Sequence, residues 1–254
     1  MKRVVVKVGS HVLTEQNRLA RDRISNLVEF LADLKKEHEV ILVSSGAVAA
    51  GYSKLKIDKS ILGNRQAIAA VGQPYLMSVY AKKLDKFGIL TAQILLSASD
   101  FDSRRRTAHA KRAVDTLIKN GIIPIINEND ATDIAELVFG DNDQMSAHAA
   151  YHFDADMLVI LSDIDGFYDC DPREFEHAVM RKVVTSVSDD DIDVEHIPHH
   201  AFATGGIATK LKAAKFLIEN GKEMFMASGF DLSDIRSFML DGVHKKGTLF
   251  KGNS

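Results

Sequence analysis

The chain has 254 residues, 46% of them hydrophobic and 26% charged, with a formal net charge of −3, so it has enough apolar material to bury a large core. Because acidic and basic residues are balanced, we expect no dedicated nucleic-acid-binding surface, and the binding partner should be small. The single cysteine, Cys170, and the lack of an apolar run of about 20 residues argue against disulfides, thiolate metal sites and membrane spans, so we expect a cytoplasmic protein.

Apolar runs alternate with amphipathic helical patterns along the whole chain. The runs are typical of strands buried on both faces, and they cover residues 4–8, 40–43, 90–96, 122–126, 157–161 and 223–227. The helical patterns cover residues 24–34, 66–86, 104–120 and 210–220. This order predicts a single α/β domain over residues 1–254, a three-layer sandwich with a mainly parallel central sheet that binds ligands at the carboxyl ends of its strands.

Glycines and hydroxyl residues follow the first two predicted strands. Lys7, Gly9 and Ser10 close the first strand, and a Ser-Ser-Gly-Ala sequence at residues 44–47 closes the second. Glycine lets the backbone approach an anion, amides at a following helix N-terminus can bind it, and a lysine adds positive charge. Either segment could be an ordinary turn, and neither matches the P-loop or the dinucleotide fingerprint. Two such turns at parallel strand ends nevertheless favour a phosphate site.

The most informative segment runs from residue 124 to residue 143, where the sequence P-I-I-N-E-N-D is followed by G-D-N-D. Six polar side chains gather there, at the end of an apolar strand and the start of a helix: Asn127, Asn129, Asp130, Asp141, Asn142 and Asp143. They are too many to be turn formers alone. The cluster therefore predicts a site for a small polar substrate.

Two segments in the second half of the chain could bind a nucleotide. Ser162 and Asp163 begin an acidic and aromatic segment, which could form a ledge for a base and ribose or a simple acidic turn. The sequence A-T-G-G-I-A-T-K at residues 203–210 has the composition of a loop that wraps polyphosphate, although a plain N-capped loop looks the same. We favour phosphate binding at the second segment.

Taken together and in order, these motifs resemble the amino-acid kinase superfamily. The similarity extends from residue 7 to about residue 250, and it rests on K-V-G-S, V-S-S-G-A-V-A-A-G, I-I-N-E-N-D, G-D-N-D, S-D-x-D-G-x-Y-x-x-D-P and T-G-G-x-x-T-K. The N-E-N-D and G-D-N-D pair is most similar to the glutamate 5-kinase branch, because other branches carry different substrate segments. Many members of that branch continue into a C-terminal domain of the pseudouridine synthase and archaeosine transglycosylase type, and this chain resembles a short form without it.

The resemblance implies ATP-dependent phosphorylation of the γ-carboxylate of L-glutamate to L-glutamyl 5-phosphate, the first step of proline biosynthesis. An anionic carboxylate must then approach an anionic phosphate, so positioning and charge neutralisation supply most of the catalysis. By the same resemblance, Lys7 and Lys210 would stabilise the transferring group and Asp143 would hold both lysines. Mg²⁺ would bridge the ATP phosphates, and no metal-binding residue is assigned.

The resemblance also divides the chain between its two substrates, with glutamate bound mainly before about residue 155 and ATP mainly after it. The implied glutamate residues are Ser45, Gly46, Asn127, Asp130, Asp141 and Asn142, with Asp130 and Asp141 as partners of the ammonium group. The implied ATP residues are Lys7, Gly9, Ser10, Ser162, Asp163, Thr204, Gly205, Gly206, Ile207, Ala208, Thr209 and Lys210. Backbone amides at Gly9, Ser10, Gly46 and Ala47 would complete the phosphate cradle.

Two other functions stay open on the sequence: a kinase of the same fold for another small carboxylate or phosphate acceptor, and a non-catalytic amino-acid sensor. A phosphate acceptor would call for basic residues where Asn127 and Asp130 stand, and a sensor would not need Lys7, Asp143 and Lys210. The resemblance further implies feedback inhibition by proline, a homo-oligomer and a functional coupling to glutamyl phosphate reductase.

Overall fold

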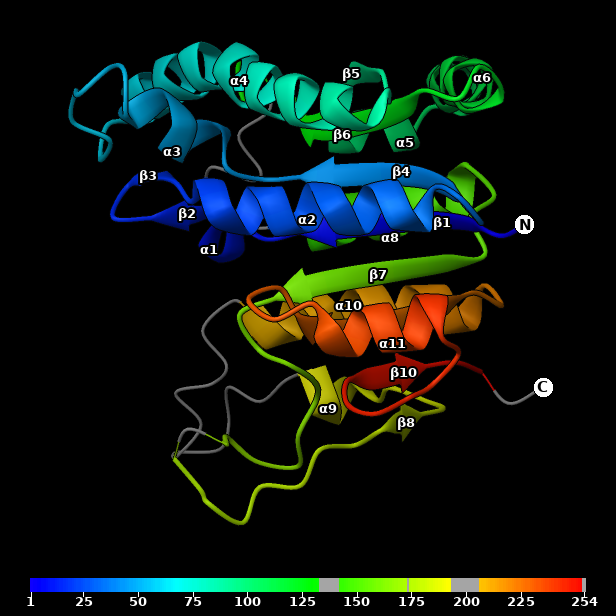
Figure 1. Cartoon of the computed structure of the whole chain (residues 1–254). Helices are drawn as coiled ribbons and strands as arrows, with labels where there is room; N and C mark the ends of the chain where they lie inside the picture. Colours follow the sequence, from blue (N-terminus) through cyan, green and yellow to red (C-terminus); the bar gives the residue numbers. More distant parts are fainter. Residues whose placement is uncertain (133–141, 173, 193–205, 253–254) are drawn as a thin grey trace.

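The computed structural model describes residues 1–132, 142–172, 174–192 and 206–252, and three predicted site residues, Asp141, Thr204 and Gly205, lie outside this part. Among the described helices, none is long and apolar enough to cross a membrane. The elements shown in Figure 1 are, in chain order, β1 (Arg3–Val8), α1 (Ser10–Leu13), β2 (Thr14–Glu15), β3 (Arg18–Leu19), α2 (Arg21–Leu34), β4 (Glu39–Ser44), α3 (Ala47–Tyr52), α4 (Leu62–Leu84), η1 (Asp85–Phe87), β5 (Thr91–Leu96), α5 (Ala98–Phe101), α6 (Arg104–Lys119), β6 (Ile123–Glu128), α8 (Asp143–His152), β7 (Met157–Ser162), β8 (Val183–Val184), α9 (Asp189–Ile192), α10 (Gly206–Glu219), β9 (Glu223–Ser228), α11 (Ser233–Leu240) and β10 (Thr248–Phe250).

The central sheet has eight strands in the order β5-β6-β4-β1-β7-β9-β10-β8 (Figure 1). The six strands from β5 to β9 run parallel to one another, and β10 runs antiparallel to β9. β1 lies between β4 and β7, and Val4, Val5 and Val6 are fully buried there because helices cover both faces of the strand. The predicted, mainly parallel sheet is confirmed.

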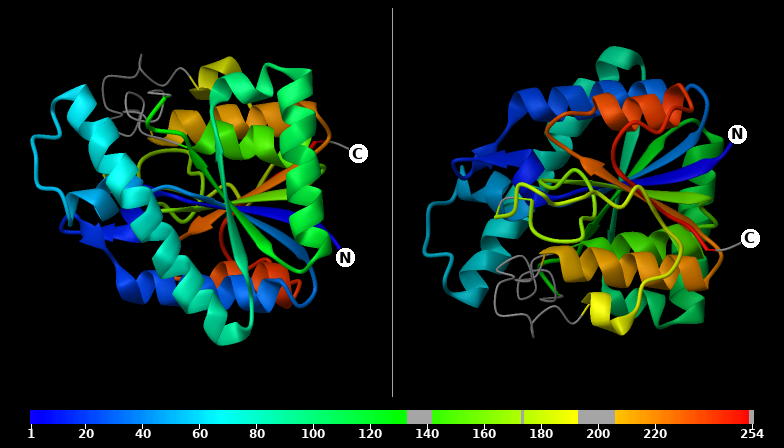
Figure 2. Two further views of the ribbon diagram at one scale, coloured as in Figure 1. Left: turned by 90° about the horizontal axis from the view of Figure 1, so that it is seen from above. Right: turned by 90° about the horizontal axis from the view of Figure 1, so that it is seen from below.

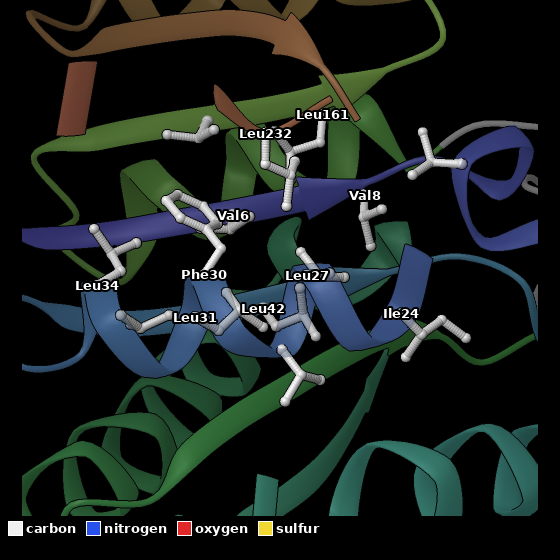
Figure 3. Packing of buried hydrophobic residues seen from close by; sticks show 14 of the residues in the cluster. Val6, Val8, Ile24, Leu27, Phe30, Leu31, Leu34, Leu42, Leu161 and Leu232 are labelled. Carbon is white, nitrogen blue, oxygen red and sulfur yellow. The ribbon is translucent and has the colours of Figure 1, made fainter. Parts of the chain in front are cut away.

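Helices cover the two faces of the sheet and complete the predicted three layers (Figure 2). On one face α2, α4 and α11 pack onto the sheet, and Phe30 of α2 lies there with Val6 and Leu42 (Figure 3). On the other face α6, α8 and α10 pack around Val5 and Ile41. Successive residues of a strand point to opposite faces, so one apolar run supplies side chains to both halves of the core.

The predicted elements match the structure with small shifts at their ends. The six apolar runs correspond to β1, β4, β5, β6, β7 and β9, and the four helical patterns to α2, α4, α6 and α10. The A-T-G-G-I-A-T-K segment opens helix α10, whose first turn begins at Gly206. The Gly206 carbonyl accepts hydrogen bonds from Lys210 Nζ at 2.9 Å and Thr209 Oγ1 at 3.1 Å, which holds this turn closed.

The parallel strands end along one edge of the sheet. Val8 at the end of β1 lies opposite both Ser44 of β4 and Leu161 of β7, and Leu96 of β5 lies opposite Glu128 of β6. The segments that follow these strands therefore meet at the same edge. They are the segments that carry most of the predicted site residues.

Candidate active site

A carboxylate lies between two lysines at the carboxyl end of β1. Lys7 comes from β1, Asp143 is the first residue of α8, and Lys210 lies in the first turn of α10. Asp143 Oδ1 is 2.6 Å from Lys7 Nζ, and Asp143 Oδ2 is 3.0 Å from Lys210 Nζ. All three residues are buried, with exposed fractions of 2% for Lys7, 0% for Asp143 and 6% for Lys210. The structure thus brings together the three predicted catalytic residues.

The surroundings of Asp143 fix the two lysines in place. Thr209 Oγ1 donates a hydrogen bond of 3.0 Å to Asp143 Oδ2, and Gln144 Nε2 donates one of 2.9 Å to the Thr209 carbonyl, so the starts of α8 and α10 are tied together. A carboxylate shared by two ammonium groups reduces their mutual repulsion and restrains their flexible side chains. Such a pair of oriented cations is suited to an anion whose charge builds up during a reaction.

Helix starts beside the cluster present backbone amides. Gly46 has a φ of 100°, the left-handed region that favours glycine, and from it the chain turns from β4 into α3. The first amides of a helix have no acceptor within that helix, so those of Ser10 in α1 and Ala47 in α3 remain candidate anion donors. The Gly9 amide differs, because it already donates a 3.2 Å hydrogen bond to the Leu161 carbonyl. Of the amides predicted for the phosphate cradle, those of Ser10 and Ala47 therefore remain candidates, while that of Gly9 already has an acceptor.

Three predicted substrate residues form a buried amide network. Asn142 Nδ2 donates to Asn127 Oδ1 at 2.8 Å and to Ser45 Oγ at 3.3 Å. Asn127 and Asn142 have exposed fractions of 1% and 0%. Asn142 Oδ1 is buried and has no hydrogen-bond partner within the described part of the chain. Since buried polar atoms are normally paired, this oxygen is a candidate acceptor for a bound ligand.

A cavity of about 180 Å³ has Asp130 in its wall, together with Gly46, which follows Ser45 of the network in the chain. Its polar lining carries both signs of charge, and it includes Asp130, Lys59, Arg65, Tyr52, Asn17 and Ser10. Lys59 Nζ donates a 2.7 Å hydrogen bond to Asn17 Oδ1, and it lies 4.8 Å from the centre of the Tyr52 ring. Lys59 and Arg65 belong to none of the motifs found in the sequence.

The predicted nucleotide site is described only in part, because Thr204 and Gly205 lie outside the described residues. Ser162 Oγ donates to Asp163 Oδ1 at 2.9 Å at the end of β7. The side chain of Ile207 points into the core, so only the backbone of this residue remains for ligand contact. The neighbouring Ala208 is partly exposed. Phe167 packs on the Phe250 ring, with centroids 6.2 Å apart, which favours a packing role over a ledge for a base.

Tyr168 follows Phe167 and points to its own acidic neighbour. Its hydroxyl donates a 2.9 Å hydrogen bond to Asp165 Oδ1. Partial burial and the contact with Asp165 raise the pKa of Tyr168 to about 12. This side chain therefore stays protonated at neutral pH and serves to hold the segment after β7.

Comparison with known proteins adds two kinds of similarity. A model of the amino acid kinase family matches residues 2–228. A glutamate 5-kinase of Wolinella succinogenes is 54% identical over 255 residues, covering 98% of this chain and 98% of that protein. A glutamate 5-kinase of Leishmania donovani is 55% identical over 250 residues, covering 98% of this chain and 95% of that protein. Both relatives are matched almost end to end.

The fold also resembles a solved structure of low sequence similarity. Carbamate kinase from Giardia lamblia bound to AMP-PNP superposes with a TM-score of 0.65 at 15% identity, covering 99% of both chains. At this identity the likeness concerns the architecture alone. It agrees with the three-layer sandwich described above.

Proposed function

This chain belongs to the amino acid kinase family and, within it, to the glutamate 5-kinases, and from this premise we propose how its site transfers a phosphoryl group from ATP to glutamate. The product is L-glutamyl 5-phosphate, an acyl phosphate. The observation that carries the mechanism is the buried Lys7–Asp143–Lys210 cluster. In it, one buried carboxylate contacts two cations from different elements.

The reaction needs neutralised charge more than it needs a base. A γ-carboxylate oxygen of glutamate forms a bond to the γ-phosphorus of ATP, while the bond from that phosphorus to the β-phosphate oxygen breaks and ADP leaves with the electron pair. No proton changes hands in this step. Lys7 and Lys210 stabilise the equatorial and leaving oxygens of the transferring group, and Asp143 keeps both ammonium groups oriented.

Glutamate enters with an ammonium group and two carboxylates, and the 180 Å³ cavity offers complementary charges. In this proposal Asp130 accepts from the ammonium group, together with the unpaired Asn142 Oδ1. Lys59 and Arg65 attract the α-carboxylate, which leaves the γ-carboxylate to face Lys7 and Lys210. The mixed charges fit an amino acid better than a phosphate acceptor, which would bring no positive group for Asp130.

ATP would bind together with Mg²⁺, which would supply charge neutralisation at the phosphates. Both oxygens of Asp143 already contact lysines, and one also accepts from Thr209. The described residues contain no cluster of three or more potential ligands of the His, Cys, Asp and Glu types. Phosphate oxygens and water would supply most of the ligands of the ion, with one or two protein oxygens at most.

The two substrates divide the chain in our proposal. Glutamate is bound mainly by the part before about residue 155, and ATP mainly by the part after it, including Ser162, Asp163 and the start of α10. Support comes from β1, which pairs with β4 of the first part and β7 of the second and carries Lys7 between them. Residues Asp141, Thr204 and Gly205 keep their proposed roles from the family resemblance.

Further proposals concern partners and place. Proline also carries an ammonium group and a carboxylate, so it would compete for the same cavity and raise the apparent KM for glutamate.

Leu90 and Leu95 are 65% and 37% exposed at the edge strand β5, which supports a homo-oligomer formed at this edge. The labile product supports direct coupling to a reductase, and the use of ATP and glutamate supports a cytoplasmic enzyme.

A coupled assay of ADP release tests this function and separates it from a sensor. Purified protein with ATP and Mg²⁺ should release ADP when L-glutamate is added, and the rate should saturate with glutamate. The Lys7→Ala variant should lose this release. Wild-type protein that binds glutamate yet releases no ADP would overturn the enzymatic proposal in favour of the sensor.

A further inference from the structure

The amide network continues outward from the substrate side to helix α4. Asn127 Nδ2 donates a 2.9 Å hydrogen bond to Gln73 Oε1, and Gln73 Nε2 donates one of 3.1 Å to Gln93 Oε1. Together with the bond from Asn142 to Asn127, these contacts align four amides head to tail, Asn142, Asn127, Gln73 and Gln93. We propose that Gln73 is a positioning residue for glutamate binding, acting through Asn127 on Asn142, an inference that rests on the proposed function.

The orientation of each amide follows from groups that can only donate or only accept. The Glu128 backbone N–H donates to Asn127 Oδ1 at 2.9 Å, so the oxygen of Asn127 must face it. Asn127 then presents Nδ2 on its other side, where it needs an acceptor. Gln73 Oε1 is that acceptor, and Gln73 holds its own orientation by donating to Gln93.

The same logic fixes the orientation of the Asn142 amide, at the opposite end of the network from Gln93. Asn142 Nδ2 faces two acceptors, Asn127 Oδ1 and the Ser44 carbonyl at 3.4 Å, so its oxygen is turned away from both. That oxygen is the buried Oδ1 without a partner among the described residues. An ammonium group is a donor of the kind it lacks. Asn127 therefore uses its polar atoms within the protein, and its contribution to binding is to orient Asn142.

Burial makes Gln73 necessary to this arrangement. Asn127 is 1% exposed, so its Nδ2 depends on the Gln73 oxygen, while Gln73 itself is 8% exposed and borders a cavity of about 210 Å³. A buried donor that loses its acceptor is costly, and a side chain that can turn will do so to recover a partner. Without Gln73, Asn127 would release Asn142 from the orientation that leaves Oδ1 available to a ligand donor. The exposed Gln93 is different, because water can replace it.

Two substitutions of similar length test this role. Gln73→Glu keeps an acceptor for Asn127, and Gln93 can turn its own amide to donate to the new carboxylate. Gln73→Met fills the same space without a polar atom. We expect Gln73→Met to raise the KM for glutamate roughly tenfold or more, the effect of a buried donor left unpaired, with the KM for ATP unchanged. Gln73→Glu should restore the glutamate KM to within about threefold of wild type.

Controls separate this inference from stability and from the function itself. Lys82→Met, at an exposed position of the same helix, should leave both KM values unchanged. Calorimetric binding of glutamate without ATP gives the same comparison if turnover fails, so a failure of the proposed function does not hide the result. Equal glutamate affinities for the Met and Glu variants, with matched melting temperatures, would overturn the positioning role, and so would an equal rise in the KM for ATP.

Discussion

At the scale of single residues, Asp143 has a position that stability alone does not explain. Removing an ion cluster from water is costly, and apolar residues of the same volume often stabilise a protein as well or better. Here the carboxylate is fully buried and holds two lysines that come from different elements, β1 and α10. The proposed role, in which the carboxylate keeps two cations ready for an anionic transition state, would account for that cost.

Lys210 should matter for the chemical step more than for glutamate binding. Replacing Lys210 with Ala removes a cation whose contact strengthens as charge builds up on the transferring group, so kcat should fall by about 10²–10³-fold. The KM for glutamate should change little. Steady-state kinetics measure both, and Lys212→Ala, at an exposed position of the same helix, is the matched control.

Asp130→Ala provides the opposite pattern, because Asp130 is proposed to bind the ammonium group and not the transferring phosphoryl group. Its main effect should be a higher KM for glutamate. If Lys210→Ala raised mainly the KM for glutamate and Asp130→Ala lowered mainly kcat, the proposed division of roles would be contradicted.

At the scale of elements, helices α3 and α4 touch backbone to backbone. A Cβ placed on Gly72 would lie 1.8 Å from the Ala47 carbonyl oxygen, and one on Gly51 would lie 1.8 Å from the Ile68 carbonyl oxygen. Such distances leave no room for a side chain. The contact holds α3, and with it Gly46 and Ala47, next to the substrate cavity.

Gly72→Ala should therefore disturb both stability and substrate binding. Separating the two helices should cost roughly 1–3 kcal/mol of unfolding free energy, and the displaced α3 should raise the KM for glutamate. Denaturant unfolding and kinetics measure the two effects. Gly63→Ala is the matched control in the same helix, because a Cβ there meets nothing within 4 Å. Equal behaviour of the two variants would contradict the packing argument.

Helix α8, which begins at Asp143, also carries the titratable group of His148. His148 lies against the rings of Phe101 and Phe216, with centroid distances of 5.5 Å and 4.6 Å. Burial, and then the neighbouring His152, lower the pKa of His148 below its ordinary value of 6.5. Between the lowered pKa and pH 6.5, His148 therefore stays neutral in the folded state but is protonated in the unfolded state. The stability that this neutral imidazole supports is present above pH 6.5 and is lost as the pH falls through the lower folded-state pKa.

Replacing His148 with Phe should make folding less sensitive to acid, since the variant has no imidazole to protonate. From about pH 7 to about pH 5, the melting temperature of the wild type should fall further than that of His148→Phe. The lowered carboxylate pKa values of Asp33 and Asp115 act in the same direction in both proteins, so they cancel in the comparison. Parallel pH profiles would show that His148 does not couple to folding.

At the scale of the whole molecule, the architecture was largely predictable because its strands are buried on both faces. β1 and β7 read as continuous apolar runs, and their glycine and serine ends marked the functional edge of the sheet. The catalytic residues could be named from local motifs through the family resemblance. That Lys7, Asp143 and Lys210 lie in contact could be seen only in the folded structure, because the three residues are far apart in sequence.

Other features could not be predicted because they depend on packing between distant segments. The contact of Gly51 with Gly72 is visible only when α3 and α4 are placed together. Lys59 and Arg65 line the substrate cavity although their segment has no motif of its own. Gln73 looks like any polar residue of an amphipathic helix until Asn127 is seen to donate to it.

The central claim, transfer of a phosphoryl group to the side-chain carboxylate of glutamate, is tested most directly by trapping the product with hydroxylamine. Purified protein is incubated with ATP, Mg²⁺ and each of several acceptors, and the hydroxamate formed from any acyl phosphate is measured. We expect a strong signal with L-glutamate and little with aspartate or N-acetylglutamate. Folded protein that binds ATP but gives no hydroxamate with glutamate would contradict the account.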